Sequence, residues 1–146
     1  MVQRQIEGRR NAACLYAYLR GIGCDFQMRV VKNEDLFFFS APHGEQANAV
    51  VSVFSSDLGA RIAVYSESEA FKACSREFRV ALLNGRLENG IYESVFFTDD
   101  GALTLQYDMI SPRAGILPAA VEHVLNDLFA HAETLRRAAE QILQAQ

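Results

Sequence analysis

The sequence predicts an α+β domain in which helices pack on one antiparallel sheet. Three observations support this class. The segments Ile91–Phe97 and Gly101–Met109 alternate apolar with polar residues, which is the period of a half-buried strand. The segment Glu67–Leu87 contains few β-branched residues and repeats its apolar side chains at helical spacing. A long amphipathic segment follows Pro118, and proline suits the first turn of a helix. Strands and helices segregated in this way are typical of two-layer α+β folds.

The remaining elements follow from local signals. The first helix should end at Gly21–Ile22–Gly23, because glycine is common at the carboxyl end of a helix. Polar turns at Lys32–Asp35 and Asp57–Gly59 each separate a pair of strands. In the last hairpin, Asp99–Asp100–Gly101 tolerates the positive φ of a tight loop. The helix Glu67–Leu87 is either continuous or broken near Lys72 to Ser75. The expected order is α-β-β-β-β-α-β-β-α, with elements at Val2–Arg20, Asp25–Val31, Leu36–Ser40, Ala49–Ser55, Arg61–Tyr65, Glu67–Leu87, Ile91–Phe97, Gly101–Met109 and a last helix from Pro118.

Length and composition indicate a single domain over residues 1–146. Half of the residues are hydrophobic and the net charge is −4. The negative charge argues against nucleic acid as the main partner, because neutralising phosphates requires a basic surface. No apolar run is long enough to span a bilayer and no signal-peptide pattern is present, so we expect a cytoplasmic protein. Cys14, Cys24 and Cys74 form no C-x-x-C pair and are expected to be buried thiols in a reducing compartment.

The aromatic run Phe37–Phe38–Phe39 has two interpretations. A strand places the first and third of these side chains on one face and the second on the other, so the run is apolar on both faces. Core packing between covering layers is the default interpretation. An exposed apolar patch that binds a partner is the alternative. The candidate partner contacts for that alternative are Phe37, Phe39, Val51 and Val53.

The last helix presents a continuous apolar stripe. Its members recur at alternating four- and three-residue steps and are Val121, Leu125, Leu128, Ala132, Leu135, Ala139 and Ile142. Such a stripe covers a sheet face or pairs with another subunit. We slightly favour a homodimer, since sheet-plus-helix domains with excess apolar faces often complete their core in that way. The candidate dimerisation contacts are Val121, Leu125, Leu128, Leu135 and Ile142.

Residues 81–137 contain a series of short motifs in a defined order. A helix ends in Leu83–Asn84, a strand carries Val95–Phe96–Phe97, and an Asp99–Asp100–Gly101 hairpin leads to the alternating strand Leu103–Asp108. A glycine-containing loop then precedes the closing helix. This arrangement resembles the YbjN family of bacterial proteins and, more distantly, the small chaperones of type III secretion systems. The resemblance implies a type III secretion chaperone-like fold, monomeric or dimeric, that binds another polypeptide and catalyses nothing.

One set of residues has the spacing of a metal site. His123, Asp127 and His131 recur every four residues on one flank of the last helix. Imidazole and carboxylate groups at this spacing could bind zinc. We favour ordinary surface interactions between residues four apart, and we predict neither a metal nor a cofactor. Gly21–Ile22–Gly23 follows a helix instead of a strand, so it is not a dinucleotide-binding loop.

Two further patterns could carry catalysis. Cys74 with Ser75 and Glu77 could form a nucleophile with a nearby base, although no recognisable signature surrounds them. The pair Asp99–Asp100 could act as acid and base, but such pairs are usually turn formers. We therefore predict no catalytic residue. The favoured function is a non-enzymatic bacterial protein-binding module, chaperone-like or regulatory, and the alternative is a small-molecule-binding or catalytic domain with a pocket between sheet and helices.

Overall fold

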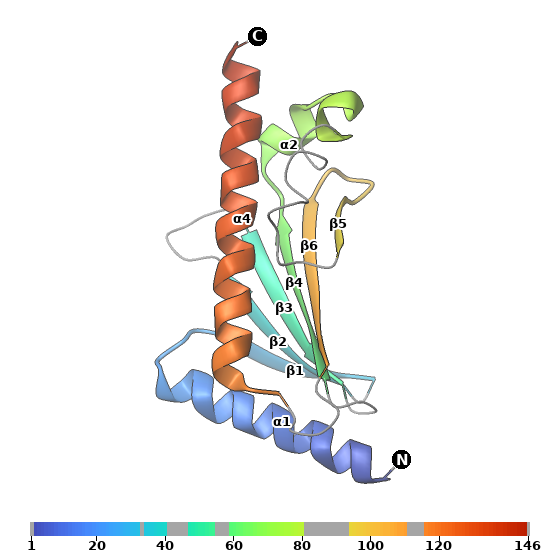
Figure 1. The fold of residues 1–146 in the computed structure, drawn as a ribbon, viewed down its shortest axis with the longest axis vertical. Coiled ribbons are helices and arrows are strands. Elements are labelled where there is room, and N and C mark those ends of the chain that lie inside the picture. Colours follow the sequence, from blue (N-terminus) through green and yellow to red (C-terminus); the bar gives the residue numbers. More distant parts are fainter. Residues whose placement is uncertain are drawn as a thin grey trace.

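A computed structural model shows a sheet with helices packed against it (Figure 1). The described residues are 2–32, 34–40, 47–54, 59–80, 94–110 and 116–145. The elements in chain order are α1 (Val2–Gly21), β1 (Gln27–Val31), β2 (Glu34–Ser40), β3 (Ala47–Val53), β4 (Gly59–Ser66), α2 (Glu69–Ala73), β5 (Ser94–Phe97), β6 (Leu103–Ile110) and α4 (Pro118–Ala145). The α+β class predicted from the sequence is confirmed.

Within the described residues the sheet has six strands, all paired antiparallel, in the order β1-β2-β3-β4-β6-β5. The predicted pairing of β1 with β2, β3 with β4 and β5 with β6 is confirmed. The pairing of β4 with β6 joins the two groups of strands across α2. Strands β1 and β5 are the two edges. Residues 91–93, which we predicted as the start of β5, lie outside the described residues.

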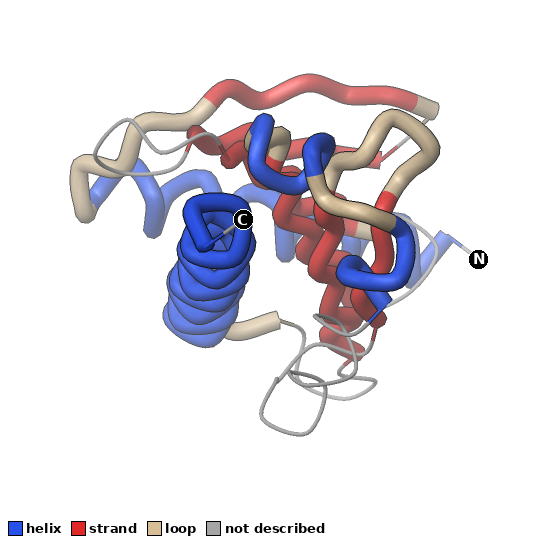
Figure 2. Tube along the Cα trace, turned by 90° about the horizontal axis from the view of Figure 1, so that it is seen from above, coloured by secondary structure: helices blue, strands red, loops and turns tan. Residues whose placement is uncertain are grey.

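Helix α4 covers one face of the sheet, which we call the inner face. It lies mainly against β4, with β6 and β3 beside it, and Figure 2 looks along this helix and shows the strands bending around one side of it. Strand β3 shows the expected alternation: Ala47, Ala49, Val51 and Val53 are buried, whereas Asn48 is exposed. The inner side chains of the strands and the apolar flank of α4 form one hydrophobic core.

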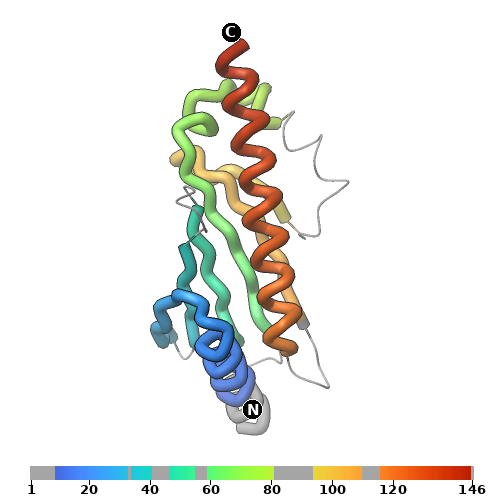
Figure 3. The backbone as a smooth tube through the Cα atoms, turned by 90° about the vertical axis from the view of Figure 1, so that its left-hand side faces the viewer, coloured from blue at the N-terminus to red at the C-terminus, as the bar shows by residue number. Residues whose placement is uncertain are grey.

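Helix α1 crosses the start of α4 at one end of the sheet (Figure 3). Its Leu15 and Leu19 enter the same core. The Tyr18 hydroxyl donates a hydrogen bond to Glu122 Oε1 at 2.8 Å, and the Asn11 Oδ1 accepts one from the backbone N–H of Ile116 at 3.4 Å. These two bonds fix the direction of α1 relative to α4. No helix among the described residues is both long and apolar enough to cross a membrane.

The carboxyl end of α1 is closed by a glycine, as predicted. Gly23 has a φ of +73°, a conformation that glycine adopts without steric cost. The N–H of Cys24 bonds to the carbonyl of Leu19 at 3.0 Å, and that of Gly23 bonds to the carbonyl of Arg20 at 3.1 Å. These are the two hydrogen bonds of a Schellman motif. The motif stops the helix and turns the chain toward β1.

The helix predicted at Glu67–Leu87 is interrupted. Ser68 caps α2 by accepting a hydrogen bond from the N–H of Ala70, and the chain becomes extended at Cys74. Residues 76–80 are helical again, and Ser75 Oγ accepts a hydrogen bond from the N–H of Phe78. The Ser68 and Ser75 side chains, at the starts of the two helical pieces, accept hydrogen bonds from backbone N–H groups that would otherwise lack partners. This capping favours two short helical pieces over one continuous helix. Residues 81–87 lie outside the described part of the chain.

The turn between β5 and β6 contains the predicted left-handed glycine. Gly101 has a φ of +87°, and its N–H bonds to the carbonyl of Thr98 at 2.9 Å. Thr98 Oγ1 also bonds to the Asp100 carboxylate, and this hydrogen bond is the main reason that the pKa of Asp100 lies below its usual value. Asp99 and Asp100 are therefore turn residues.

Substituting Gly101 with alanine should destabilise the protein. A left-handed conformation costs a non-glycine residue roughly 1–2 kcal/mol, and the new Cβ would lie 3.2 Å from atoms of both Lys72 and Arg79. The matched control is Gly21→Ala, because no atom lies within 4 Å of its Cβ position and the residue ends a helix. Urea unfolding should show a loss for Gly101→Ala and none for Gly21→Ala. Equal losses would contradict this account of the turn.

Candidate functional site

The predicted partner contacts belong to the core. Phe37, Phe39, Val51 and Val53 are at most 5% exposed, because they all lie on the inner face that the helices cover. A partner cannot reach these side chains in the folded chain, so we no longer assign them a docking role. The default interpretation, core packing, holds for Phe37 and Phe39. Phe38 points to the opposite face and is half-buried.

The predicted dimerisation stripe is also occupied within the chain. Val121, Leu125, Leu128 and Leu135 are at most 5% exposed because they pack on the inner face of the sheet. Of the five predicted contacts, Ile142 alone is exposed. Four of the five predicted dimerisation contacts therefore pack against the chain's own sheet, whereas Ile142 stays accessible.

The histidine flank of α4 forms a surface pair. His123 Nε2 lies 3.4 Å from Asp127 Oδ2, and both side chains are exposed. Within the described ranges, no group of three or more His, Cys, Asp or Glu side chains is placed to hold a metal ion. The interaction of His123 with Asp127 is the surface contact that residues four apart on a helix commonly make.

The three cysteines differ in their surroundings. Cys74 is buried and its thiol donates to the Ala70 carbonyl at 3.0 Å. Burial raises the pKa of the Cys74 thiol, which disfavours the thiolate that a nucleophile needs. Cys14 is exposed, so the prediction that all three thiols are buried is wrong. Cys24 is partly buried and lines a groove.

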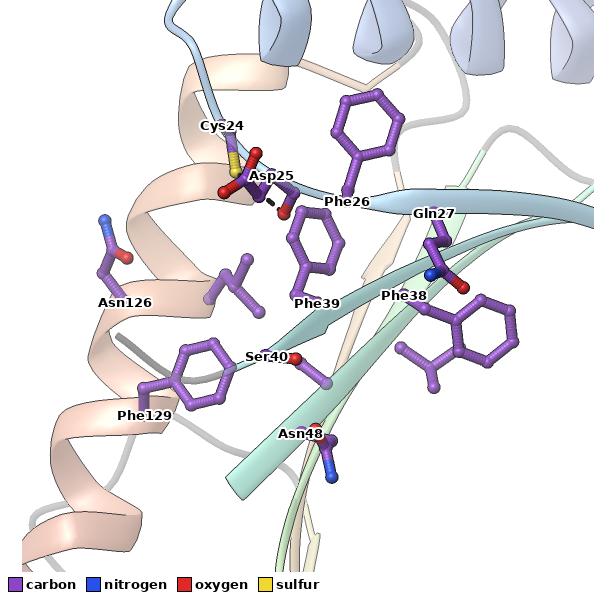
Figure 4. Close-up of a pocket in the computed structure, with 13 residues that line it drawn as sticks. Cys24, Asp25, Phe26, Gln27, Phe38, Phe39, Ser40, Asn48, Asn126 and Phe129 are labelled. Carbon is purple, nitrogen blue, oxygen red and sulfur yellow. Dashed lines mark hydrogen bonds between the residues drawn. The ribbon is translucent and has the colours of Figure 1, made fainter. Parts of the chain in front are cut away.

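That groove is an open site with a volume of about 750 Å³, and we call it the corner groove (Figure 4). It lies between α4, the ends of β2 and β3, and the segment that joins α1 to β1. Its lining residues are Cys24, Asp25, Phe26, Gln27, Phe38, Phe39, Ser40, Asn48, Ala49, Val50, Leu125, Asn126 and Phe129.

A mismatch in strand length creates the corner groove. Strand β1 begins at Gln27, which pairs with Phe38, whereas β2 continues to Ser40. Phe39 and Ser40 are therefore paired with β3 but not with β1. The chain before Gln27 leaves the sheet to reach the end of α1, and the space that it vacates is bounded on its far side by α4 (Figure 4).

The corner groove is apolar inside and amide-rich at its rim. Figure 4 shows Phe39 and Phe129 on the same side of β2, between the strand and α4. Phe26 is half-buried beside these rings, whereas Phe38 and Val50, also half-buried, lie on the opposite face of the sheet at the same corner. The exposed rim residues with side-chain amides are Gln27, Asn48 and Asn126. No hydrogen bond between described residues engages those three amides.

The charge in the corner groove is negative. Asp25 is the one charged residue among its described lining residues and is exposed. The pKa of the Cys24 thiol is raised first by burial, and then by the carboxylates of Asp25 and Glu122. These carboxylates therefore lie close enough to the thiol to disfavour a second negative charge. The groove suits a neutral or basic ligand better than an acidic one.

The sequence contained only part of the signal for this site. Phe129 follows Leu125 by four residues, so the two side chains lie on the same flank of a helix. That spacing indicates a wider apolar face than the stripe we assigned. The register of β1 against β2 could not be predicted from local patterns, because it depends on where the chain leaves the end of α1 after the Schellman motif.

Comparisons with known proteins do not add to this description. No family model, no curated protein and no solved structure matches the chain.

Truncating Phe37 should cost far more stability than truncating an exposed aromatic residue. Phe37→Ala removes a side chain with 0% exposure and should lower the free energy of unfolding by roughly 3–5 kcal/mol. Phe96→Ala is the control, because Phe96 is 42% exposed on β5, and its loss should be below about 1 kcal/mol. Chemical denaturation of both variants measures the difference. A Phe37→Ala protein of unchanged stability would mean that this ring is not part of the core.

The cysteines should react with iodoacetamide in the order of their exposure. Cys14 is exposed, Cys24 is partly buried and Cys74 is buried. The raised pKa values of Cys24 and Cys74 further reduce their thiolate fractions near neutral pH, so their reaction should accelerate as pH rises. Mass spectrometry of the folded protein after timed labelling gives the three rates. If Cys74 were labelled as fast as Cys14, the result would contradict the burial of Cys74 in this structure.

Proposed function

We propose that this protein is a non-enzymatic binding module that docks a segment of another polypeptide in the corner groove. The observation that carries the proposal is the groove itself, an open apolar site at the place where β2 and β3 outrun β1. A chaperone-like or regulatory role is consistent with such a module. The type III secretion chaperone-like resemblance remains part of this proposal and is not required by it.

The lining chemistry matches a polypeptide segment. The accessible ring of Phe26 offers apolar surface to a partner's side chains beside α4, and Phe38 and Val50 offer more on the opposite face of the same sheet corner. Large aromatic groups in partly formed pockets contribute strongly to protein interfaces. Each rim amide offers both a donor and an acceptor, as a peptide backbone does. The occupant we infer is an apolar segment with neutral or basic flanking residues, since Asp25 and Glu122 oppose an acidic segment.

The candidate nucleophile and acid–base pair have structural roles. The Cys74 thiol donates to the Ala70 carbonyl of the preceding helix α2, and burial raises the pKa of the thiol. Asp100 bonds to Thr98 within the hairpin turn. These positive roles explain both motifs without a reaction, and they support a module that binds and does not catalyse.

One observation favours a small-molecule ligand as a second candidate. A volume of about 750 Å³ lies within the range of roughly 300–1,000 Å³ that is common for ligand pockets. Its position between the sheet and α4 is also where we expected such a pocket. Against this candidate, the described part of the lining offers a single charged group, Asp25, to orient a metabolite.

Obstructing the rim should abolish peptide binding. Peptides are first selected from a random displayed library on the wild-type protein. Asn126→Arg places a bulky side chain at the rim and should weaken the selected peptides at least tenfold, a loss of about 1.4 kcal/mol. Gln141→Arg is the matched control, because it makes the same amide-to-arginine change on the exposed side of α4, about four turns away. Fluorescence anisotropy measures each dissociation constant.

The cysteines report where the peptide lies. A peptide in the corner groove should slow alkylation of Cys24 and leave that of the exposed Cys14 unchanged. Failure to select any peptide, or equal binding to Asn126→Arg and Gln141→Arg, would overturn the proposal. A metabolite that raises the melting temperature and protects Cys24 would instead support the small-molecule candidate.

A further inference from the structure

Strand β1 has an unusual surface for the edge of a sheet. All five of its side chains are exposed, and three of them are large and apolar: Met28 is 38% exposed, Val30 66% and Val31 46%. Its other side is unpaired among the described strands, because β2 is its one neighbour. An exposed apolar edge strand is a template for pairing with another strand.

The features that usually protect an edge are weak in β1. The strand contains no proline and one charged residue, Arg29, whose guanidinium lies over the Phe38 ring at 5.5 Å. On the inner face, a hollow of about 550 Å³ separates β1 from α1, with Tyr16, Met28 and Val30 on its walls. Tyr16 is also exposed. Exposed apolar side chains therefore continue from the strand onto the helix.

We propose that β1 pairs antiparallel with β1 of a second copy of the chain, about a twofold axis. This inference goes beyond the corner groove and does not depend on it. A twofold axis perpendicular to the sheet places one residue opposite itself and keeps both inner faces on the same side. The two sheets would then join into one continuous sheet, and the exposed side chains of Met28 and Val30 from both copies would line the inner side of the seam.

Charge selects the register of this pairing. An axis at Arg29 would place two guanidinium groups opposite each other, which is unfavourable. An axis at Val30 places the two Val30 side chains opposite each other and Arg29 opposite Val31 of the second copy. Val31 pairs with Glu34 in β2. The Glu34 carboxylate of the second copy would therefore lie one strand beyond the residue opposite Arg29. The basic β1 and the acidic start of β2 are therefore complementary to their own copies.

The oligomeric state tests the inference. Analytical ultracentrifugation of the full chain should show a dimer, and Val30→Lys should raise its dissociation constant at least tenfold by placing two ammonium groups at the axis. The matched control is Phe96→Lys, which alters an exposed apolar residue on the other edge strand, β5, and should leave the dimer intact. A monomeric wild-type chain at tens of micromolar would overturn the inference, even if β1 then proved to bind a strand of a different protein.

Cross-linking tests the register and separates it from a change in folding. With Cys14 and Cys24 replaced by serine, Val30→Cys should form disulfide-linked dimers under mild oxidation, because directly opposite residues have Cβ atoms about 4.5–5.5 Å apart. Phe96→Cys in the same background should not. Circular dichroism would verify that both variants are folded. Equal cross-linking at the two positions would show non-specific contact and overturn the register.

Discussion

The packing of α4 on the inner face of the sheet is the interaction on which the rest of the structure depends. The helix spans Pro118–Ala145 and contributes eight buried residues to the core. It lies against the central strand β4, whose Ile62 and Val64 are completely buried. Burying a side chain of this size contributes roughly 1.5–3 kcal/mol, so this one contact surface supplies a large share of the driving force for folding. Two hydrogen bonds also hold helix α1 against this unit, one from Tyr18 to Glu122 of α4 and one from the N–H of Ile116, just before α4, to Asn11.

The same packing explains the location of the two open surfaces. Because α4 and α1 cover the centre of the inner face, apolar surface on the described part of that face stays accessible where the covering ends. One such place is the corner groove, beyond the start of β1, and the other is β1 itself, where α1 stands off the strand. The positions of both surfaces are set by the ends of helices and strands. Neither surface depends on a residue type that is rare in such elements.

Electrostatic interactions have a smaller part in this protein. Arg61 Nε lies 2.8 Å from Asp108 Oδ1 across β4 and β6, and the hydrogen bond from Arg61 lowers the pKa of Asp108. The Arg61 side chain is about half exposed, so solvent screening limits the pair to at most about 1 kcal/mol. Glu133 bonds to Arg136 and Arg137 on the surface of α4. Such pairs orient side chains on the outside of a fold whose stability comes from its core.

Local chemistry by itself determined the elements of this protein. Alternation with period two marked the strands, apolar spacing marked α4, and Gly23 and Gly101 lie at positive φ in the predicted stops and turns. Those signals act over a few residues, which is why a single chain reveals them. Which apolar surface stays uncovered was decided only by the tertiary structure. The alternation in β2 and β3 predicts that Phe37 and Val51 share a face, but it does not predict which element covers that face. The apolar stripe on α4 could equally pack on a second subunit or on the chain's own sheet. The register of β1 against β2, and the point where α1 releases the chain, are long-range outcomes of packing, and they alone place the corner groove.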